Sequence, residues 1–260
     1  IFIYDSGNCF DDGRTDLGDA VGRSMVSHSI FHLQSNYMST RISAVIIAYN
    51  EARNITRCIE SLSDVCFEVI VVDSYSTDNT ALLAEQLGAK VLQRKWDNYI
   101  EQKNYGNEKA MGDYILSIDA DEYLSPALRE KLKDSNSFES FDIISFNRLN
   151  NYIGKWMKHG EWYPDKKVRL WKKGCAKWGG SIPHETVLFN PDLKTTHIPL
   201  DILHITHQSI DEHILKSSKY AILSTDEVWL KSAGSLWFKL LFSGVFRFFK
   251  LLFLLGGILD

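Results

Sequence analysis

The chain has 260 residues, a formal net charge of −4, 45% hydrophobic residues and 24% charged residues. This balance is typical of a globular protein and excludes a disordered chain or a fibrous repeat. Lys and Arg number 29 against 33 Asp and Glu, so no overall basic field favours nucleic acid as a partner. The four cysteines form no C-x-x-C pair, which favours free thiols in a reducing compartment.

The two ends of the chain differ from its body. Residues 1–37 show neither helical nor strand periodicity and no secretory signal, and ordered patterning begins at Met38. We expect Met38 to be the natural start and residues 1–37 to be a non-native or disordered extension. Residues 226–260 carry a basic stripe on a wide aromatic face, which is typical of an amphipathic helix on a membrane surface. A helix packed on the globular body is the alternative, and the apolar end of the chain indicates truncation.

From residue 42 the chain alternates short apolar runs with amphipathic stretches. The patterning predicts, in chain order, strand 42–48, helix 51–62, strand 67–73, helix 77–90, strand 90–94, helix 99–111 and strand 113–119. Continuous β-branched runs are typical of strands buried on both faces of a parallel sheet. The alternation predicts an α/β fold with a Rossmann-like, mostly parallel, doubly wound sheet, which binds ligands at the carboxyl ends of its strands.

The second half of the chain, from about residue 126, is less regular. It contains candidate strands at 141–150 and 167–173 and a candidate helix at 210–223. No repeat or low-complexity linker separates the halves, so we expect one body that spans residues 38–225.

The strongest local signal is the acidic motif Asp119-Ala120-Asp121-Glu122, which directly follows the fourth predicted strand. Carboxylates at positions i and i+2 of an extended segment point to the same side, so Asp119 and Asp121 are placed to engage one divalent ion. Hard oxygen ligands suit Mg²⁺ or Mn²⁺, which typically share their coordination with substrate phosphates. The alternative is an acidic turn without a metal.

Polar residues also follow the first two predicted strands. They are Tyr49, Asn50 and Glu51 after the first strand, and Asp73, Ser74, Ser76 and Asp78 after the second. These groups suit recognition of a base and a ribose. Neither crossover carries the G-x-G-x-x-G loop, which argues against a dinucleotide site and against a methyltransferase. The alternative is that these residues only shape turns and cap the next helix.

In their order and spacing, "VIIAYNE", "VIVVDSYSTDNT" and "GDYILSIDADE" resemble the family 2 glycosyltransferases. They most resemble the bacterial branch of lipopolysaccharide core β-1,4-glucosyltransferase-like proteins. The resemblance covers roughly residues 41–260 and includes "QKNYG", "PDKKVRLWKKG", "PHE" and the histidine of "DILHIT". It implies a glycosyltransferase-A fold, a nucleotide-sugar donor and inversion at the anomeric carbon. We therefore divide the body into a donor half at about 41–125 and an acceptor half at about 126–225.

The resemblance also assigns roles to individual residues. Ser74 stands where many relatives have a second aspartate facing the base, and Lys103 stands where relatives often place a basic residue near the donor. The implied donor-binding positions are Tyr49, Asn50, Glu51, Asp73, Ser74, Lys103 and Asp119. The implied metal-holding residue is Asp121 with Asp119 beside it, and His204 either completes the metal shell or is an ordinary hydrogen-bonded histidine.

The expected mechanism follows from the charges. Negative charge develops on the leaving nucleoside diphosphate, and a metal ion held by Asp121 stabilises it. The attacking acceptor hydroxyl must lose a proton to a carboxylate within hydrogen-bond reach. Glu185 is the leading candidate for this base because it lies in the acceptor half, and Asp165 is the second candidate. A purely structural carboxylate is the alternative for Glu185.

We therefore expect a metal-dependent, inverting glycosyltransferase on the cytoplasmic face of the cytoplasmic membrane. It would move a hexose from a UDP-sugar to a lipopolysaccharide-core or lipid-linked saccharide, with Mn²⁺ or Mg²⁺ as cofactor. One alternative is transfer to a polyprenyl phosphate. Another is a non-catalytic, membrane-peripheral protein of the same fold that binds a sugar or a nucleotide.

Overall fold

A computed structural model describes residues 40–181, 184–223, 243–244 and 246–250. The expected extension at 1–37 lies outside the described residues, and so does most of the expected amphipathic helix at 226–260. None of the helices in the described ranges is long and apolar enough to cross a membrane.

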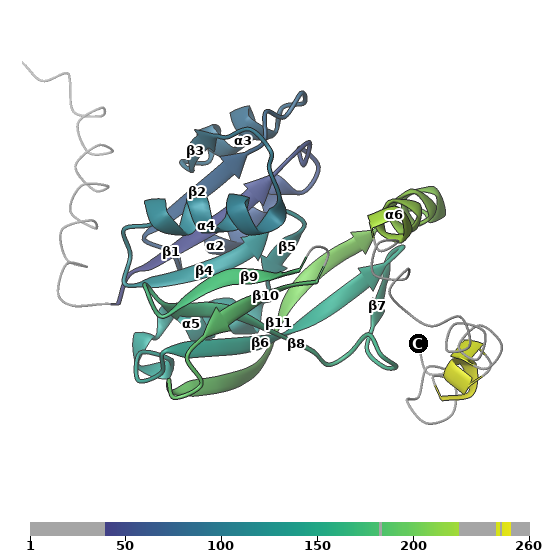
Figure 1. The fold of residues 1–260 in the computed structure, drawn as a ribbon. Coiled ribbons are helices and arrows are strands. Elements are labelled where there is room, and N and C mark those ends of the chain that lie inside the picture. The colour runs from purple at the N-terminus through teal and green to yellow at the C-terminus, as the bar shows by residue number, and fades with distance from the viewer. Residues whose placement is uncertain (1–39, 182–183, 224–242, 245, 251–260) are drawn as a thin grey trace, which may run out of the picture. The chain divides into compact units, whose positions relative to one another are not determined.

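The first half of the chain forms four neighbouring strands of a nine-stranded sheet. These strands are parallel and stand in the order β3–β2–β1–β4 (Figure 1). Its elements are β1 (Ile42–Ala48), α2 (Ile55–Leu62), β2 (Glu68–Asp73), α3 (Thr80–Gln86), β3 (Lys90–Gln93), α4 (Tyr99–Lys109) and β4 (Tyr114–Asp119). In the register, Ala48 of β1 is level with Asp73, and Ile47 is level with Asp119. The polar ends of these three strands therefore meet at one edge, as the sequence predicted.

Two helices begin later than the sequence pattern predicted. Helix α2 begins at Ile55 and α3 at Thr80. The residues before each helix form hydrogen bonds between the loop after β1 and the loop after β2 and therefore do not join the helices. The Asn50 side-chain oxygen accepts from the Thr77 N–H at 2.8 Å, and an Asp78 carboxylate oxygen accepts from the Ala52 N–H at 3.1 Å. Side chains of this kind compete with helical hydrogen bonds.

The second half completes the sheet in the order β4–β8–β6–β11–β5, with β7 paired to β6. Its elements are β5 (Glu122–Leu124), α5 (Pro126–Lys133), the 3₁₀ turn η1 (Ser135–Ser137), β6 (Ile143–Tyr152), β7 (Lys155–Met157), β8 (Asp165–Lys172), β9 (Ala176–Ser181), β10 (His184–Phe189), β11 (Thr195–His207) and α6 (Ile210–Leu223). Strand β8 is antiparallel to both β4 and β6. The parallel arrangement thus holds for the first half, and the rest of the sheet is mixed because the short β6–β7–β8 connections contain no crossover helix.

Helix α4 packs against β1 and β2 and also contacts β9 of the β9–β10 hairpin. At Gly106 the helix approaches β1 so closely that a Cβ atom would lie 2.4 Å from Cγ1 of Val45. The Asn104 side chain both accepts from the Trp178 N–H and donates to the Trp178 carbonyl, each at 2.9 Å. The indole N–H of Trp178 donates to Ser117 on β4 at 3.1 Å. The hairpin is therefore fixed beside the end of β4.

Candidate functional site

The loop after β2 is built around the fully buried carboxylate of Asp73. Its Oδ2 accepts from the Ser76 N–H at 3.0 Å and from the Gln93 amide at 2.8 Å, and its Oδ1 accepts from the Ser76 hydroxyl. The neighbouring Ser74 hydroxyl accepts from Gln102 of α4 at 2.8 Å. Asp73 thus holds the shape of the loop and presents Ser74 and the following residues at the sheet edge.

The loop after β1 is bonded to the β2 loop. Asn50 has a positive φ of 57°, which Asn tolerates better than most residues, and its N–H donates to the Ser76 hydroxyl at 2.9 Å. Glu51 accepts from the Asn54 amide at 2.8 Å, and burial raises the pKa of its carboxyl group. Tyr49 is exposed beside them. These residues form a polar edge with an accessible aromatic ring, which suits a nucleoside.

Asp119, at the end of β4, lies between two cations. Its Oδ1 is 2.7 Å from Nζ of Lys103, and its Oδ2 is 2.9 Å from a guanidinium nitrogen of Arg169. Burial raises the pKa of Asp119, but the charges of Lys103 and Arg169 outweigh burial and hold its pKa well below the usual range. Both carboxylate oxygens of Asp119 are therefore paired with cations of the protein.

The ion pairs continue from Asp119 towards the second half of the chain. Arg169 also lies 2.6 Å from the fully buried Glu122, whose other oxygen accepts from the Asp119 N–H at 3.1 Å. Arg148 is 3.7 Å from Glu122 and 2.7 Å from Asp165. We call this alternating series of ion pairs the charge row, made up of Lys103, Asp119, Arg169, Glu122, Arg148 and Asp165.

Asp121 contacts a histidine rather than a cation of the charge row. Its Oδ2 is 3.4 Å from Nε2 of His204 on β11. Nδ1 of the same ring is 2.7 Å from the side-chain oxygen of Asn150, whose amide nitrogen donates to the Trp162 carbonyl at 3.2 Å. An amide oxygen only accepts, so Nδ1 donates to Asn150, and Nε2 is the ring nitrogen that faces Asp121. This is the arrangement in which an outer hydrogen bond prepares a histidine to bind a metal.

Asp121 and His204 fit the divalent cation that the sequence predicted. Among the described residues no three His, Cys, Asp or Glu side chains form a group that could hold a metal ion, which argues against a closed protein cage. One carboxylate oxygen and one imidazole nitrogen instead leave room for substrate phosphate and water, as Mg²⁺ and Mn²⁺ sites usually do. Asp119 and Asp121, predicted to engage one ion together, have separate partners here.

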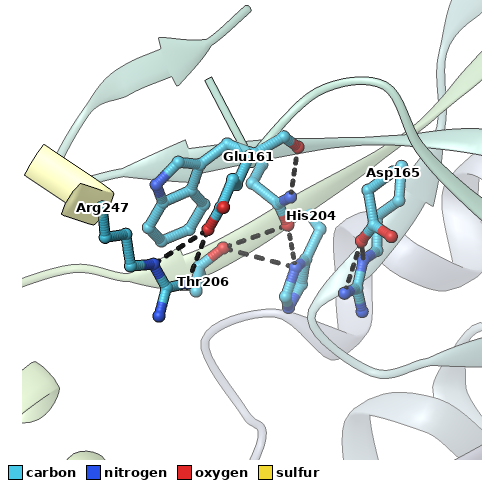
Figure 2. A pocket seen from close by; sticks show the side chains of 8 residues that line it. Glu161, Asp165, His204, Thr206 and Arg247 are labelled. Carbon is cyan, nitrogen blue, oxygen red and sulfur yellow. Dashed lines mark hydrogen bonds and ion pairs between the residues drawn. The ribbon is translucent and has the colours of Figure 1, made fainter. Parts of the chain in front are cut away.

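A cavity of about 500 Å³ opens beside His204 (Figure 2). Asp165 and His204 both line it, and Arg247 reaches it from the segment 246–250 and pairs with Glu161 at 2.5 Å. Burial raises the pKa of Asp165, but the positive charges of Arg148 and Lys167 lower it by more than burial raises it. The net pKa of Asp165 is therefore below its usual value. The full lining is Arg148, Asn150, Glu161, Trp162, Asp165, His204, Thr206 and Arg247.

The structure does not join Glu185 to this cavity. Glu185 lies on β10 opposite Gly180, and its Oε1 is buried with no hydrogen-bond partner in the described part of the chain. Sequence reasoning missed Arg148 and Asn150. The signal available for them was the run of polar residues in the second half of a strand that begins apolar, "IISFNRLNN".

Comparison with known proteins places these features in a family. The model of glycosyl transferase family 2 matches residues 43–194. An uncharacterized glycosyltransferase of Rickettsia felis is 32% identical over 82% of this chain and 79% of its own length. The lipopolysaccharide core biosynthesis glycosyltransferase LpsC of Rhizobium meliloti is 30% identical over 82% of this chain and 80% of its own length.

Solved structures with similar folds include S. aureus TarS 1–349 in complex with UDP. The TM-score is 0.43 and the identity is 18%, over 61% of this chain and 60% of that one, so this chain spans about three fifths of that structure's length. On the family match and the sequence relatives, the chain belongs to glycosyltransferase family 2, with the α/β glycosyltransferase-A fold, and is a glycosyltransferase.

Proposed function

We propose that this glycosyltransferase is inverting, depends on a divalent cation and transfers a hexose from a UDP-sugar to a saccharide acceptor. The observation that carries the proposal is the Asp121–His204 pair, 3.4 Å apart. The pair lies between the sheet edge formed by the loops after β1 and β2, which suits a nucleoside, and the 500 Å³ cavity that His204 lines. A donor at the edge and an acceptor in the cavity would then meet beside this pair.

The residues of the edge would bind the donor. Tyr49, Asn50 and the loop that Asp73 shapes would hold the nucleoside, and Lys103 would place positive charge near the diphosphate. Asp121 and His204 would hold Mn²⁺ or Mg²⁺, which neutralises the charge that develops on the leaving diphosphate. Their geometry is set in advance by Asn150, so little reorganisation is needed when the donor binds.

The acceptor hydroxyl needs a proton acceptor, and the two candidate carboxylates differ. Asp165 is paired with Arg148 and Lys167 and has a lowered pKa, which makes it a weak base but a good partner for acceptor hydroxyl groups. Glu185 has a buried oxygen without a partner among the described residues. We therefore favour Glu185 as the base, which requires the attacking hydroxyl of the acceptor to reach the β9–β10 hairpin. Glu185→Gln should retain UDP binding and lose transfer, and unchanged turnover would reject this role.

The acceptor and the location of the enzyme are proposed from two further observations. LpsC, the relative at 30% identity, is named for lipopolysaccharide core biosynthesis, which supports a lipopolysaccharide-core saccharide as acceptor. In the segment 246–250, Phe246, Phe248 and Phe249 are exposed next to Arg247 and Lys250. This combination suits attachment to the anionic inner face of the cytoplasmic membrane. Flotation with anionic vesicles tests the attachment, and failure to float would reject it.

The donor and the metal are tested together by a thermal-shift titration with UDP, GDP and ADP, each with and without Mn²⁺. A ligand at 100 times its Kd stabilises a protein by about 2.7 kcal/mol, which corresponds to several degrees in Tm. We expect this shift for UDP only with Mn²⁺, and we expect Asp121→Ala to abolish it. Asp192→Ala, an exposed aspartate in the β10–β11 turn, is the matched control. A UDP shift that is independent of Mn²⁺ and of Asp121 would contradict the proposed metal site.

A further inference from the structure

A second cavity, of about 610 Å³, lies at the start of α2 and the ends of β6 and β11. Along β11, His204 and Thr206 line the first cavity, whereas Ile205 and His207 line the second. Successive side chains of a strand point to opposite faces, and the regular pairs His204–Asn150 and Ile205–Asn151 line the first and the second cavity respectively, so the two cavities lie on opposite faces of β11. The Ile205 N–H donates to the Asp121 carbonyl at 3.0 Å, which connects the wall of the second cavity to the loop that carries Asp121.

Two arginines in this second cavity have no acidic partner among the described residues. Arg53 donates to the side-chain oxygen of Gln208 at 3.1 Å, and Arg57 donates to that of Asn54 at 3.4 Å and lies over the ring of Tyr123. Within the described ranges neither guanidinium has a carboxylate oxygen within 4.0 Å. In this part of the chain, neutral partners therefore orient both side chains, and neither guanidinium forms an ion pair.

The remaining lining is polar and nearly free of negative charge. Glu60 is its one carboxylate among the described residues, and it pairs with neither arginine. The other lining residues are Asn54, Thr56, Asn151, Gly154, Ile205, His207 and Gln208. Amide and hydroxyl groups of this kind suit sugar hydroxyls, and a guanidinium binds a phosphate or carboxylate through two parallel hydrogen bonds.

We propose that the second cavity binds an oxyanion, a phosphate or a carboxylate, carried by the acceptor saccharide. This inference rests on the proposed function, because it gives the acceptor of that reaction a chemical class. Arg53 and Arg57 bind the oxyanion, and Asn54, Asn151 and Gln208 bind hydroxyls of the sugar that bears it. Because the second cavity lies on the other face of β11 from the first, the oxyanion is a recognition group and not the attacking hydroxyl.

The test measures binding of three small probes to the full chain saturated with UDP and Mn²⁺, by ligand-observed NMR. The probes are glucose 6-phosphate, glucuronate and glucose. We expect at least one anionic probe to bind ten times more tightly than glucose, and its identity distinguishes a phosphate from a carboxylate. In the double variant Arg53→Gln/Arg57→Gln this probe should bind at least ten times more weakly. Arg41→Gln, an exposed arginine at the opposite end of β1 that pairs with Asp113, should leave binding unchanged.

The outcomes separate this inference from the proposed donor site. Equal binding of the three probes, or an unchanged Kd in the double variant, overturns the inference. Weaker UDP binding in the double variant also overturns it, because the arginines would then serve the donor. If no nucleotide binds the folded wild type, the probes are titrated without UDP and Mn²⁺. Binding of an anionic probe that depends on Arg53 and Arg57 then supports oxyanion binding in the second cavity, although the proposed donor is rejected.

Discussion

Gly106 provides a quantitative test of how the donor side of the fold is held together. A Cβ atom at this position would lie 2.4 Å from Cγ1 of Val45 and 3.0 Å from Cγ2 of Val72. Carbon atoms in contact prefer about 3.5–4.0 Å, so α4 would have to move by about 1 Å. Val45 is β-branched and buried, and therefore has little rotameric freedom to relieve the overlap.

The expected cost of Gly106→Ala follows from two opposing effects. Overpacking a core costs about 1–3 kcal/mol, and the better helix propensity of alanine returns about 1 kcal/mol. We expect a net loss of up to about 2 kcal/mol, which lowers Tm by up to about 8 °C in a domain of this size. Helix α4 also carries Lys103, so UDP should bind more weakly to Gly106→Ala even at a temperature where the variant is folded.

Urea denaturation of a double-mutant cycle tests the geometry directly. Val45→Ala removes the atom that overlaps, so Gly106→Ala should cost less in the Val45→Ala background than in the wild type, by about 1 kcal/mol. Additive effects of the two substitutions, or a stabilising effect of Gly106→Ala alone, would refute the close approach of α4 to β1 and its link to donor binding.

Two further predictions concern the Asp121–His204 pair and the charge row. Asn150→Ala should weaken Mn²⁺ binding about 10–100-fold in calorimetry, because Asn150 orients the ring of His204. The far-UV circular dichroism should stay unchanged. An unaltered Mn²⁺ affinity would mean that Asn150 does not position His204. The pKa of Asp165 is lower in the folded protein than in the unfolded chain, where it is about 4. Ionised Asp165 therefore stabilises the fold above about pH 4, and this stabilisation is lost as the pH falls through the pKa of the folded protein. Asp165→Asn should therefore narrow the difference in Tm between pH 7 and pH 3, and an unchanged difference would count against the ion pair with Arg148.

The donor side of the fold was predictable because local patterns determine it. The apolar runs 42–48 and 113–119 appear as β1 and β4 (Tyr114–Asp119), and parallel pairing with β1 brings their polar ends to one edge. Gly88 has a φ of 81° just after α3, as is common for a glycine that follows a helix. Helix starts were less predictable, because Asn50 and Asp78 bond across the loops, although Asp78 also accepts from the N–H of Thr80, the first residue of α3.

The acceptor side was less predictable because non-local pairing determines it. His204 meets Asn150 because β11 pairs with β6 in parallel, with these two residues in register, although 54 positions separate them. No local pattern encodes that register. Glu122 likewise reads as an exposed acid in a turn, whereas the structure buries it completely beside Arg169. Hydrophobic periodicity does not predict a buried carboxylate whose counter-charge comes from a distant strand.

The charge row changes how a substitution in the acidic motif should be interpreted. Asp119 neutralises Lys103 and Arg169, which are both buried, and removing one partner of a buried ion pair typically costs about 3–5 kcal/mol. Asp119→Ala would therefore reduce activity through misplacement of Lys103 and Arg169 even if Asp119 never touches a metal ion. Loss of activity alone does not distinguish the roles of Asp119 and Asp121. The Mn²⁺ affinity does, because our proposal gives the metal contact to Asp121 and His204, whereas Asp119 is paired with Lys103 and Arg169.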